Sequence, residues 1–199
     1  MQTEKKPSFP EFSRLVIDAL EAAQVQYMVS GSVALAAWAE PRTTIDIDLV
    51  INLPVEQVYS LSQQLIQREM LVPYDILLDL LLQEEGDLPI NAIHLSTGFK
   101  AELFLLRPGD TFRETALARR LLVTLGAPLG DVYVQSPEDL ILYKLRYFKL
   151  SGQTKHMRDI RSIIVTMGQE LDDAYIQRWI DHFNLHSVWH QAQGWMDTP

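Results

Sequence analysis

Cysteine is absent from the 199-residue sequence. Its absence excludes disulfide bonds, thiolate metal sites and cysteine nucleophiles, and it fits a reducing compartment such as the cytosol. Long hydrophobic runs are missing as well. The longest nearly apolar stretch, residues 76–82, is interrupted by Asp79 and is far shorter than the roughly 20 residues that span a bilayer. Residues 1–12 are polar and lack the apolar segment of a signal peptide. We therefore expect a cytoplasmic protein that does not enter a membrane.

Positive charge is also in short supply. Lys and Arg number 17 against 26 Asp and Glu, which gives a net charge of -9. A protein that coats nucleic acid usually has the opposite balance. Basic residues nevertheless gather between residues 141 and 164, where Asp159 is the one acidic residue among Lys144, Arg146, Lys149, Lys155, Arg158 and Arg161. This pattern disfavours non-specific binding of RNA or DNA and leaves room for one local anion site.

Two common nucleotide-binding loops are missing too. The sequence contains neither G-x-G-x-x-G nor G-x-x-x-x-G-K-[ST], so neither a Rossmann site nor a Walker-type site is supported. No Ser/His/Asp arrangement typical of a hydrolase stands out either.

Hydrophobic periodicity predicts helices and strands along most of the chain. Apolar residues at helical spacing predict helices over residues 10–24, 33–39, 54–68, 74–84 and 111–120. Short apolar runs predict strands over residues 27–29, 44–51, 121–125 and 132–134, and a hairpin made of residues 92–95 and 99–106. Ser136 and Pro137 form a typical helix start, and the pattern after them is helical to the end.

These elements predict an α/β (α+β) fold. We expect a small mixed β-sheet with helices, followed by a C-terminal helical region. The change in composition near Gln135 is the only candidate boundary, so we predict a core domain over residues 1–135 and a helical region over residues 136–199 that packs on it. The hydrophobic content of 47% is enough for a sizeable core.

A pair of carboxylates lies in the predicted strand 44–51. Residues i and i+2 of a strand point to the same face, so Asp46 and Asp48 project side by side. Two ionised carboxylates so close repel each other unless a cation lies between them. Magnesium prefers oxygen ligands and completes its shell with water or phosphate oxygens. The pair therefore predicts a platform for a metal-bound nucleoside triphosphate (NTP); the alternative is a solvated strand edge.

Three further features would complete such a site. Glu102, in the second strand of the hairpin, could share a metal with the aspartates and help to activate an attacking hydroxyl; it could also simply face solvent. Gly31 permits a tight turn, and Ser32 could cap the following helix or contact a phosphate at the helix N-terminus. Arg42 and Thr44 precede the carboxylates and could contact phosphates or ribose, although Arg42 could equally be a solvated loop residue.

The segment from Ser30 to Ile51 resembles the nucleotidyltransferase superfamily of the DNA polymerase beta type. It is most similar to the minimal, AbiEii-like group found among toxin–antitoxin toxins. That group has a strand, a Gly-Ser or Gly-Gly turn, a short helix and then R-x-T-x-D-x-D. Arg42, Thr44, Asp46 and Asp48 stand at those positions.

The group also has a downstream S-P-E-D-L…K segment and a helix with D-I, matched here by residues 136–140, Lys144 and Asp159. The resemblance implies that Lys144 binds the triphosphate and that Asp159 orients Lys144 or the base. Without it, these two residues would form an interhelical surface ion pair. The third acidic position is Glu102, where Asp is commoner in the group, and this departure changes the expected geometry.

The function that follows is transfer of a nucleoside monophosphate (NMP) from an NTP to an acceptor hydroxyl, with Mg²⁺ or Mn²⁺ as cofactor. The acceptor would be RNA or tRNA, a protein, or a small molecule such as an aminoglycoside. A basic groove toward Lys149, Lys155 and Arg158 would favour tRNA, and a closed acidic pocket would favour a cationic antibiotic. The alternative is an inactive module that binds a nucleotide or a protein partner such as an antitoxin.

Two more clusters allow several interpretations. His182, His186 and His190 recur at four-residue spacing and could bind zinc on one face of a continuous helix, but Asn184 argues against that continuity and nearby aromatic residues favour packing. Tyr143, Tyr147 and Phe148 could stack nucleotide bases, although core packing is expected for at least two of the three.

Overall fold

The structure is a computed structural model that describes residues 6–83 and 88–194. It is an α/β fold built on a mixed six-stranded sheet with strand order β3-β4-β2-β1-β6-β5. The predicted fold class is therefore confirmed. The strands are β1 (Gln26–Val29), β2 (Asp46–Asn52), β3 (Ile90–Ile93), β4 (Lys100–Leu105), β5 (Leu121–Thr124) and β6 (Asp131–Val134).

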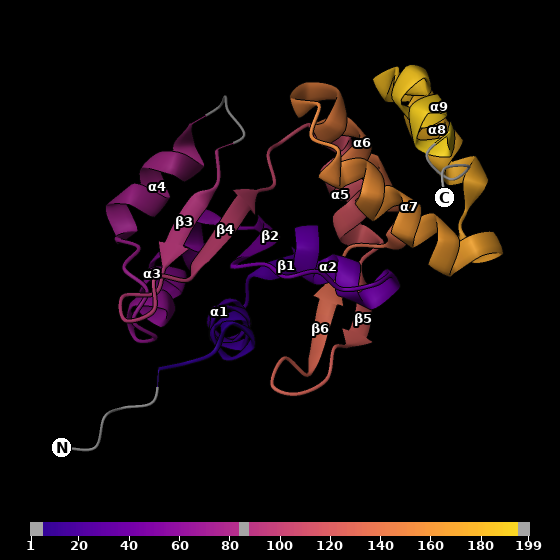
Figure 1. The fold of residues 1–199 in the computed structure, drawn as a ribbon. Helices are drawn as coiled ribbons and strands as arrows, with labels where there is room; N and C mark the ends of the chain where they lie inside the picture. The colour runs from indigo at the N-terminus through magenta and orange to yellow at the C-terminus, as the bar shows by residue number, and fades with distance from the viewer. Residues whose placement is uncertain (1–5, 84–87, 195–199) are drawn as a thin grey trace.

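Helices from the N-terminal part and from the C-terminal part of the chain pack around the sheet. Figure 1 shows α3 and α4 beside β3 and β4 at one end of the molecule, and α6 to α9 gathered at the other. The helices are α1 (Phe9–Ala22), α2 (Gly31–Trp38), α3 (Val58–Ile66), α4 (Tyr74–Leu82), α5 (Thr111–Ala118), α6 (Pro137–Ser151), α7 (Lys155–Met167), α8 (Asp173–Phe183) and α9 (His186–Gly194). Short 3-10 turns precede α3 and follow α7.

Strand β2 lies in the middle of the sheet and divides its side chains between two environments. It runs parallel to β4 and antiparallel to β1. Ile47, Leu49 and Ile51 are fully buried in the main hydrophobic core, together with apolar side chains of α1 and α3. Asp46 and Asp48 alternate with them and so face the opposite side of the sheet. On that side α5 packs near Val50. The first residues of β2, which include Asp46 and Asp48, are therefore not covered by this helix.

Helix α2 begins directly after β1, through a sharp turn. Gly31 is its first residue and has a φ of 60°, a left-handed conformation. The N-cap is Ser30, not Ser32, so the predicted capping role of Ser32 is wrong. The hydroxyl of Ser30 donates a hydrogen bond to Gln135 Oε1 at 2.7 Å instead of capping the helix. Ser32 lies one residue inside the helix and is buried.

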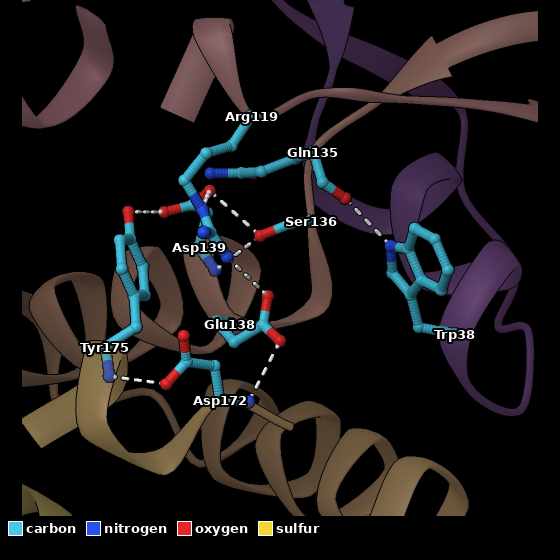
Figure 2. A network of polar contacts seen from close by, with 8 residues as sticks. All are labelled: Trp38, Arg119, Gln135, Ser136, Glu138, Asp139, Asp172 and Tyr175. Atoms are coloured by element: carbon cyan, nitrogen blue, oxygen red, sulfur yellow. Dashed lines mark hydrogen bonds and ion pairs between the residues drawn. The ribbon is translucent and has the colours of Figure 1, made fainter. Parts of the chain in front are cut away.

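A buried polar network fixes the start of α6 (Figure 2). Ser136 is the N-cap, as predicted, and accepts a hydrogen bond from the backbone N–H of Asp139. Asp139 is fully buried and accepts hydrogen bonds from the hydroxyls of Ser136, at 2.9 Å, and Tyr175, at 2.5 Å. The guanidinium of Arg119 lies 3.9 Å from the centre of the Tyr175 ring. The network therefore holds α8 and the end of α5 against the helix that carries Lys144.

The predicted elements are present, with small changes at their ends. The hairpin is confirmed as the antiparallel pair β3–β4. The helix predicted over residues 54–68 is a 3-10 turn followed by α3, and residue 84, the predicted end of another helix, lies outside the described residues. The division of the chain at residue 135 stays a prediction. Within the described ranges, no helix has the length and apolar content needed to cross a bilayer.

Candidate active site

A cavity of about 520 Å³ opens where the polar side of the sheet meets α2, α6 and α7. It collects every residue that the sequence singled out for the site except Asp159, which lies behind Lys144. Those that line it are Gly31, Ser32, Arg42, Thr44, Asp46, Asp48, Glu102 and Lys144. Residues separated by more than 100 positions therefore meet in one cavity.

The parallel pairing of β2 with β4 brings the acidic residues together. Asp48 is in register with Glu102, and Asp46 is in register with Lys100. The pKa of Asp48 is raised to about 6, chiefly by burial and then by the charges of Asp46 and Glu102, while Lys144 acts in the opposite direction. The expectation that the strand of Glu102 lies beside that of the aspartates is confirmed. The like charges repel one another, and a cation between them would relieve this repulsion.

Each of the three carboxylates already has a partner in the protein, since Asp48 and Glu102 share a side-chain hydrogen bond. The hydroxyl of Thr44 donates a hydrogen bond to Asp46 Oδ1 at 2.6 Å. The ammonium of Lys100 forms an ion pair with Glu102. Among the described residues, no three His, Asp or Glu side chains converge as a ready metal-binding group. Lys100 was not anticipated from the sequence, although its position two residues before Glu102 places both side chains on the same face of β4.

The Gly31 turn touches the carboxylates directly. A Cβ atom on residue 31 would lie 1.9 Å from Asp48 Oδ2, so only glycine fits there. The backbone N–H of Ser30 donates a hydrogen bond to the carbonyl oxygen of Asp48 at 2.8 Å. The turn between β1 and α2 is therefore packed against Asp48, and the N-terminus of α2 faces the same cavity.

Lys144 projects from α6 into the floor of the cavity. Its ammonium contacts Asp159 Oδ2 at 2.6 Å, and each side chain is only 5% exposed. Arg42 reaches Asp159 from the other side at 3.3 Å. Burial lowers the pKa of Lys144, while Asp159 and Asp48 act in the opposite direction. Lys144 and Asp159 therefore form an interhelical ion pair, as the alternative has it, but the pair is buried beside the carboxylates and does not lie at the surface.

The donor set fits a divalent cation of the magnesium type. Mg²⁺ binds hard oxygen ligands and usually takes one or two carboxylates, with water and substrate phosphates completing its shell. Asp46 and Asp48 supply such carboxylates, and the missing Cβ of Gly31 leaves the space that Asp48 occupies.

Aromatic side chains of α6 and α7 form one wall of the cavity. Tyr143, Tyr147 and His156 line it, whereas Phe148 packs against the hydrophobic core. His156 was not anticipated, because its place beside Tyr147 depends on how α7 packs on α6.

The three C-terminal histidines do not share a helix. Asn184 takes a left-handed conformation at the end of α8, and α9 starts at His186. The zinc interpretation has no support in the described residues, where His182 packs against Trp179 and His186 pairs with Asp181.

No protein-family model matches the chain, and no curated protein sequence matches it. Solved structures do. The antibiotic-resistance factor ANT(2'')-Ia, determined in solution, matches with a TM-score of 0.59 and 15% identity, over 92% of this chain and 96% of that chain. The fold is that of a nucleotidyltransferase.

Two further structures share the nucleotidyltransferase fold with this chain. A crystal structure of ANT(2'')-Ia in complex with adenylyl-2''-tobramycin gives a TM-score of 0.56 and 18% identity, over 87% of this chain and 98% of that one. An antigenic nucleotidyltransferase-like protein from Paracoccidioides brasiliensis gives a TM-score of 0.50 and 19% identity, over 90% of this chain and 91% of that chain. The fold that the resemblance implied is thus confirmed.

Proposed function

We propose that the protein is a magnesium-dependent nucleotidyltransferase that moves an NMP from an NTP to an acceptor hydroxyl and releases pyrophosphate. One observation carries this proposal. The carboxylates of Asp46, Asp48 and Glu102 face the same cavity as the Gly31 turn and the buried ammonium of Lys144. Carboxylates suited to a cation therefore share one cavity with an ammonium and a helix N-terminus suited to phosphate.

Each side chain has a distinct task in this reaction. Asp46 and Asp48 hold the divalent ion, which would neutralise charge on the phosphates when bound. Lys144, oriented by Asp159, and the N-terminus of α2 at Ser32 bind the β- and γ-phosphates. Glu102 accepts the proton of the acceptor hydroxyl as that oxygen attacks the α-phosphorus and the bond to pyrophosphate breaks. Arg42 and Thr44 hold Asp159 and Asp46 in place.

Release of pyrophosphate tests the proposal. The purified protein is incubated with Mg²⁺, each of the four NTPs and candidate acceptors, namely total RNA, tRNA, an aminoglycoside and the protein itself. We expect pyrophosphate with at least one combination and a loss of at least 100-fold in Asp48→Asn, since removing a group that positions reacting phosphates has effects of that order. An unchanged rate in Asp48→Asn would exclude this mechanism.

A non-catalytic module is the second candidate, and the Lys100–Glu102 ion pair favours it. Glu102 is occupied by an internal cation, so the site could bind Mg²⁺ and NTP without activating an acceptor. Tight, magnesium-dependent binding of an NTP in calorimetry, with no pyrophosphate from any acceptor, would support this function. Such a module would act by docking a protein partner such as an antitoxin.

The cavity does not match either acceptor surface in full. Lys155 lines it, but Lys149 caps the carbonyl groups at the end of α8. The acidic residues in its lining are the three proposed catalytic ones, beside Arg42, Arg113, Lys144 and Lys155. This mixed charge favours a phosphate-bearing acceptor such as RNA over a polycationic aminoglycoside. Membership of the AbiEii-like group and a cytoplasmic location remain part of the proposal.

A further inference from the structure

Three aromatic rings are stacked along one wall of the cavity. The rings of Tyr143 and Tyr147 have centres 6.5 Å apart and an interplanar angle of 29°. The rings of Tyr147 and His156 have centres 6.0 Å apart and an angle of 20°. Tyr143 is 6% exposed and Tyr147 is 37% exposed. The wall thus begins in the core on α6 and ends at the cavity, where α7 starts.

One ring nitrogen of His156 lacks a hydrogen-bond partner among the described residues. This atom, Nδ1, is buried, and a missing partner is rare for a buried polar atom. Burial lowers the pKa of His156 to about 4, so the ring is neutral at physiological pH. A neutral imidazole presents a flat face and either one donor or one acceptor at Nδ1.

The charges around this ring are mostly positive. Lys144, Lys155 and Arg42 all act to lower the pKa of His156, and Asp159 acts against them. A polycationic ligand would be repelled here. A flat ring joined to phosphate suits the wall, because the ring can stack while the phosphate meets the cations.

We propose that Tyr147 and His156 bind a nucleobase, with Tyr147 as the stacking surface and His156 Nδ1 as a hydrogen-bonding partner for the edge of the base. This inference rests on the proposed function, since it places a nucleotide in the same cavity. The base belongs to the incoming NTP or to the 3′-terminal nucleotide of an RNA acceptor. Both share the same chemistry, a purine or pyrimidine linked through ribose to phosphate.

Calorimetry with three probes tests the proposal. The first probe is an α,β-methylene NTP with Mg²⁺, which cannot react. The second is inorganic tripolyphosphate with Mg²⁺, which has no base. The third is a short oligoribonucleotide with a free 3′ hydroxyl. Each is titrated into the full-length protein and into Tyr147→Leu, with Tyr147→Phe as the matched control that keeps the ring.

We expect Tyr147→Leu to weaken at least one base-containing probe by roughly 5- to 150-fold, the effect of losing one stacked base. Tyr147→Phe should stay within about threefold, because phenylalanine stacks as well. Tripolyphosphate affinity should not change. A loss confined to the NTP analogue identifies the incoming nucleotide, and a loss confined to the oligoribonucleotide identifies the acceptor. Unchanged affinity for both base-containing probes, or an equal loss for tripolyphosphate, overturns the proposal.

A second variant tests the polar edge. His156→Phe keeps a flat ring but removes Nδ1, so it should preserve binding and reduce the differences in affinity among the A, G, C and U analogues. If the four analogues keep the same order of affinity and the same differences in affinity, Nδ1 does not bind the edge of the base.

The two proposals fail in different ways. If the wild-type protein binds a base through Tyr147 but releases no pyrophosphate with any acceptor, transfer is wrong and the base site stands. If pyrophosphate is released and the KM values for the NTP and the acceptor are unchanged in Tyr147→Leu, the base site is wrong and transfer stands.

Discussion

At the scale of single residues, Gly31 controls where Asp48 lies. Gly31→Ala would force a Cβ atom to within 1.9 Å of Asp48 Oδ2 at a φ of 60°. We expect a loss of about 1–3 kcal/mol in the free energy of unfolding from backbone strain, and a fall of about 100-fold or more in pyrophosphate release from a displaced carboxylate. Gly98→Ala is the matched control, because Gly98 has a φ of 74° but nothing within 4 Å of its Cβ position. It should be destabilised and remain active; equal activity losses in the two variants would contradict the steric explanation.

Asp48 should make the metal-free protein less stable as the pH rises. Its pKa lies at about 6 in the folded protein, above the ordinary value of 3.8, so the folded state binds its proton more tightly than the unfolded state. The associated stability is present below about pH 4 and is lost as the pH rises through about 6. A shift of this size corresponds to about 3 kcal/mol at most.

Asp48→Asn removes this effect. Urea unfolding in EDTA should show the variant to be more stable than the wild type by about 1–3 kcal/mol at pH 7.5 and equally stable at pH 4. Added Mg²⁺ should raise the stability of the wild type and leave that of the variant nearly unchanged. Asp79→Asn, on the exposed surface of α4, should show no difference at either pH. Destabilisation of Asp48→Asn at pH 7.5 would show that the carboxylates do not repel one another.

Most residues of the candidate site could be predicted from the sequence, because the R-x-T-x-D-x-D segment and Lys144 lie at recognisable spacing. Lys100 and His156 were not anticipated, for different reasons. Lys100 pairs with Glu102 within β4, and the two-residue spacing that puts both side chains on one face was a signal in the sequence. The role of His156 depends on the packing of α7 against α6, which brings its ring to Tyr147. Contacts between elements carry no periodic signal in the sequence.

At the scale of elements, the polar network at the start of α6 joins three helices (Figure 2). Tyr175→Phe keeps the ring beneath Arg119 but removes the hydroxyl that donates to the fully buried Asp139 at 2.5 Å. We expect a loss of about 1–3 kcal/mol, because a buried carboxylate oxygen loses its partner. Urea unfolding measures this loss, and Tyr59→Phe, with a side chain that is 62% exposed, should change stability by less than about 0.5 kcal/mol. Equal stability of Tyr175→Phe and the wild type would mean that water replaces the hydroxyl.

Periodicity predicted the elements because each has one face in the core. Strand β2 alternates buried Ile47 and Leu49 with the partly exposed aspartates, and α1 starts within one residue of its predicted position. The long C-terminal helical pattern divides into α6, α7, α8 and α9 at residues such as Gly152 and Asn184, which take left-handed conformations. Strand order could not be predicted, since it depends on which crossover buries most apolar surface.

At the scale of the whole molecule, the Lys144–Asp159 pair joins α6 to α7 and, through Arg42, to the loop before β2. Lys144→Met leaves Asp159 buried with only Arg42 as a charged partner among the described residues. We expect a loss of up to about 3–5 kcal/mol, the usual effect of removing one member of a buried pair. The double variant Lys144→Met/Asp159→Leu removes both charges and should recover most of this stability.

The same two variants separate the structural role of Lys144 from its role with phosphate. Binding of Mg²⁺–tripolyphosphate, measured by calorimetry, should be weakened in the single variant and stay weakened in the double variant, although the latter is stable. Both charges of the pair are then dispensable for folding, and the ammonium is required for the ligand. Recovery of binding together with stability would instead show that Lys144 acts only by holding α6 and α7 together, and the phosphate would have to be bound by Arg42 and the N-terminus of α2.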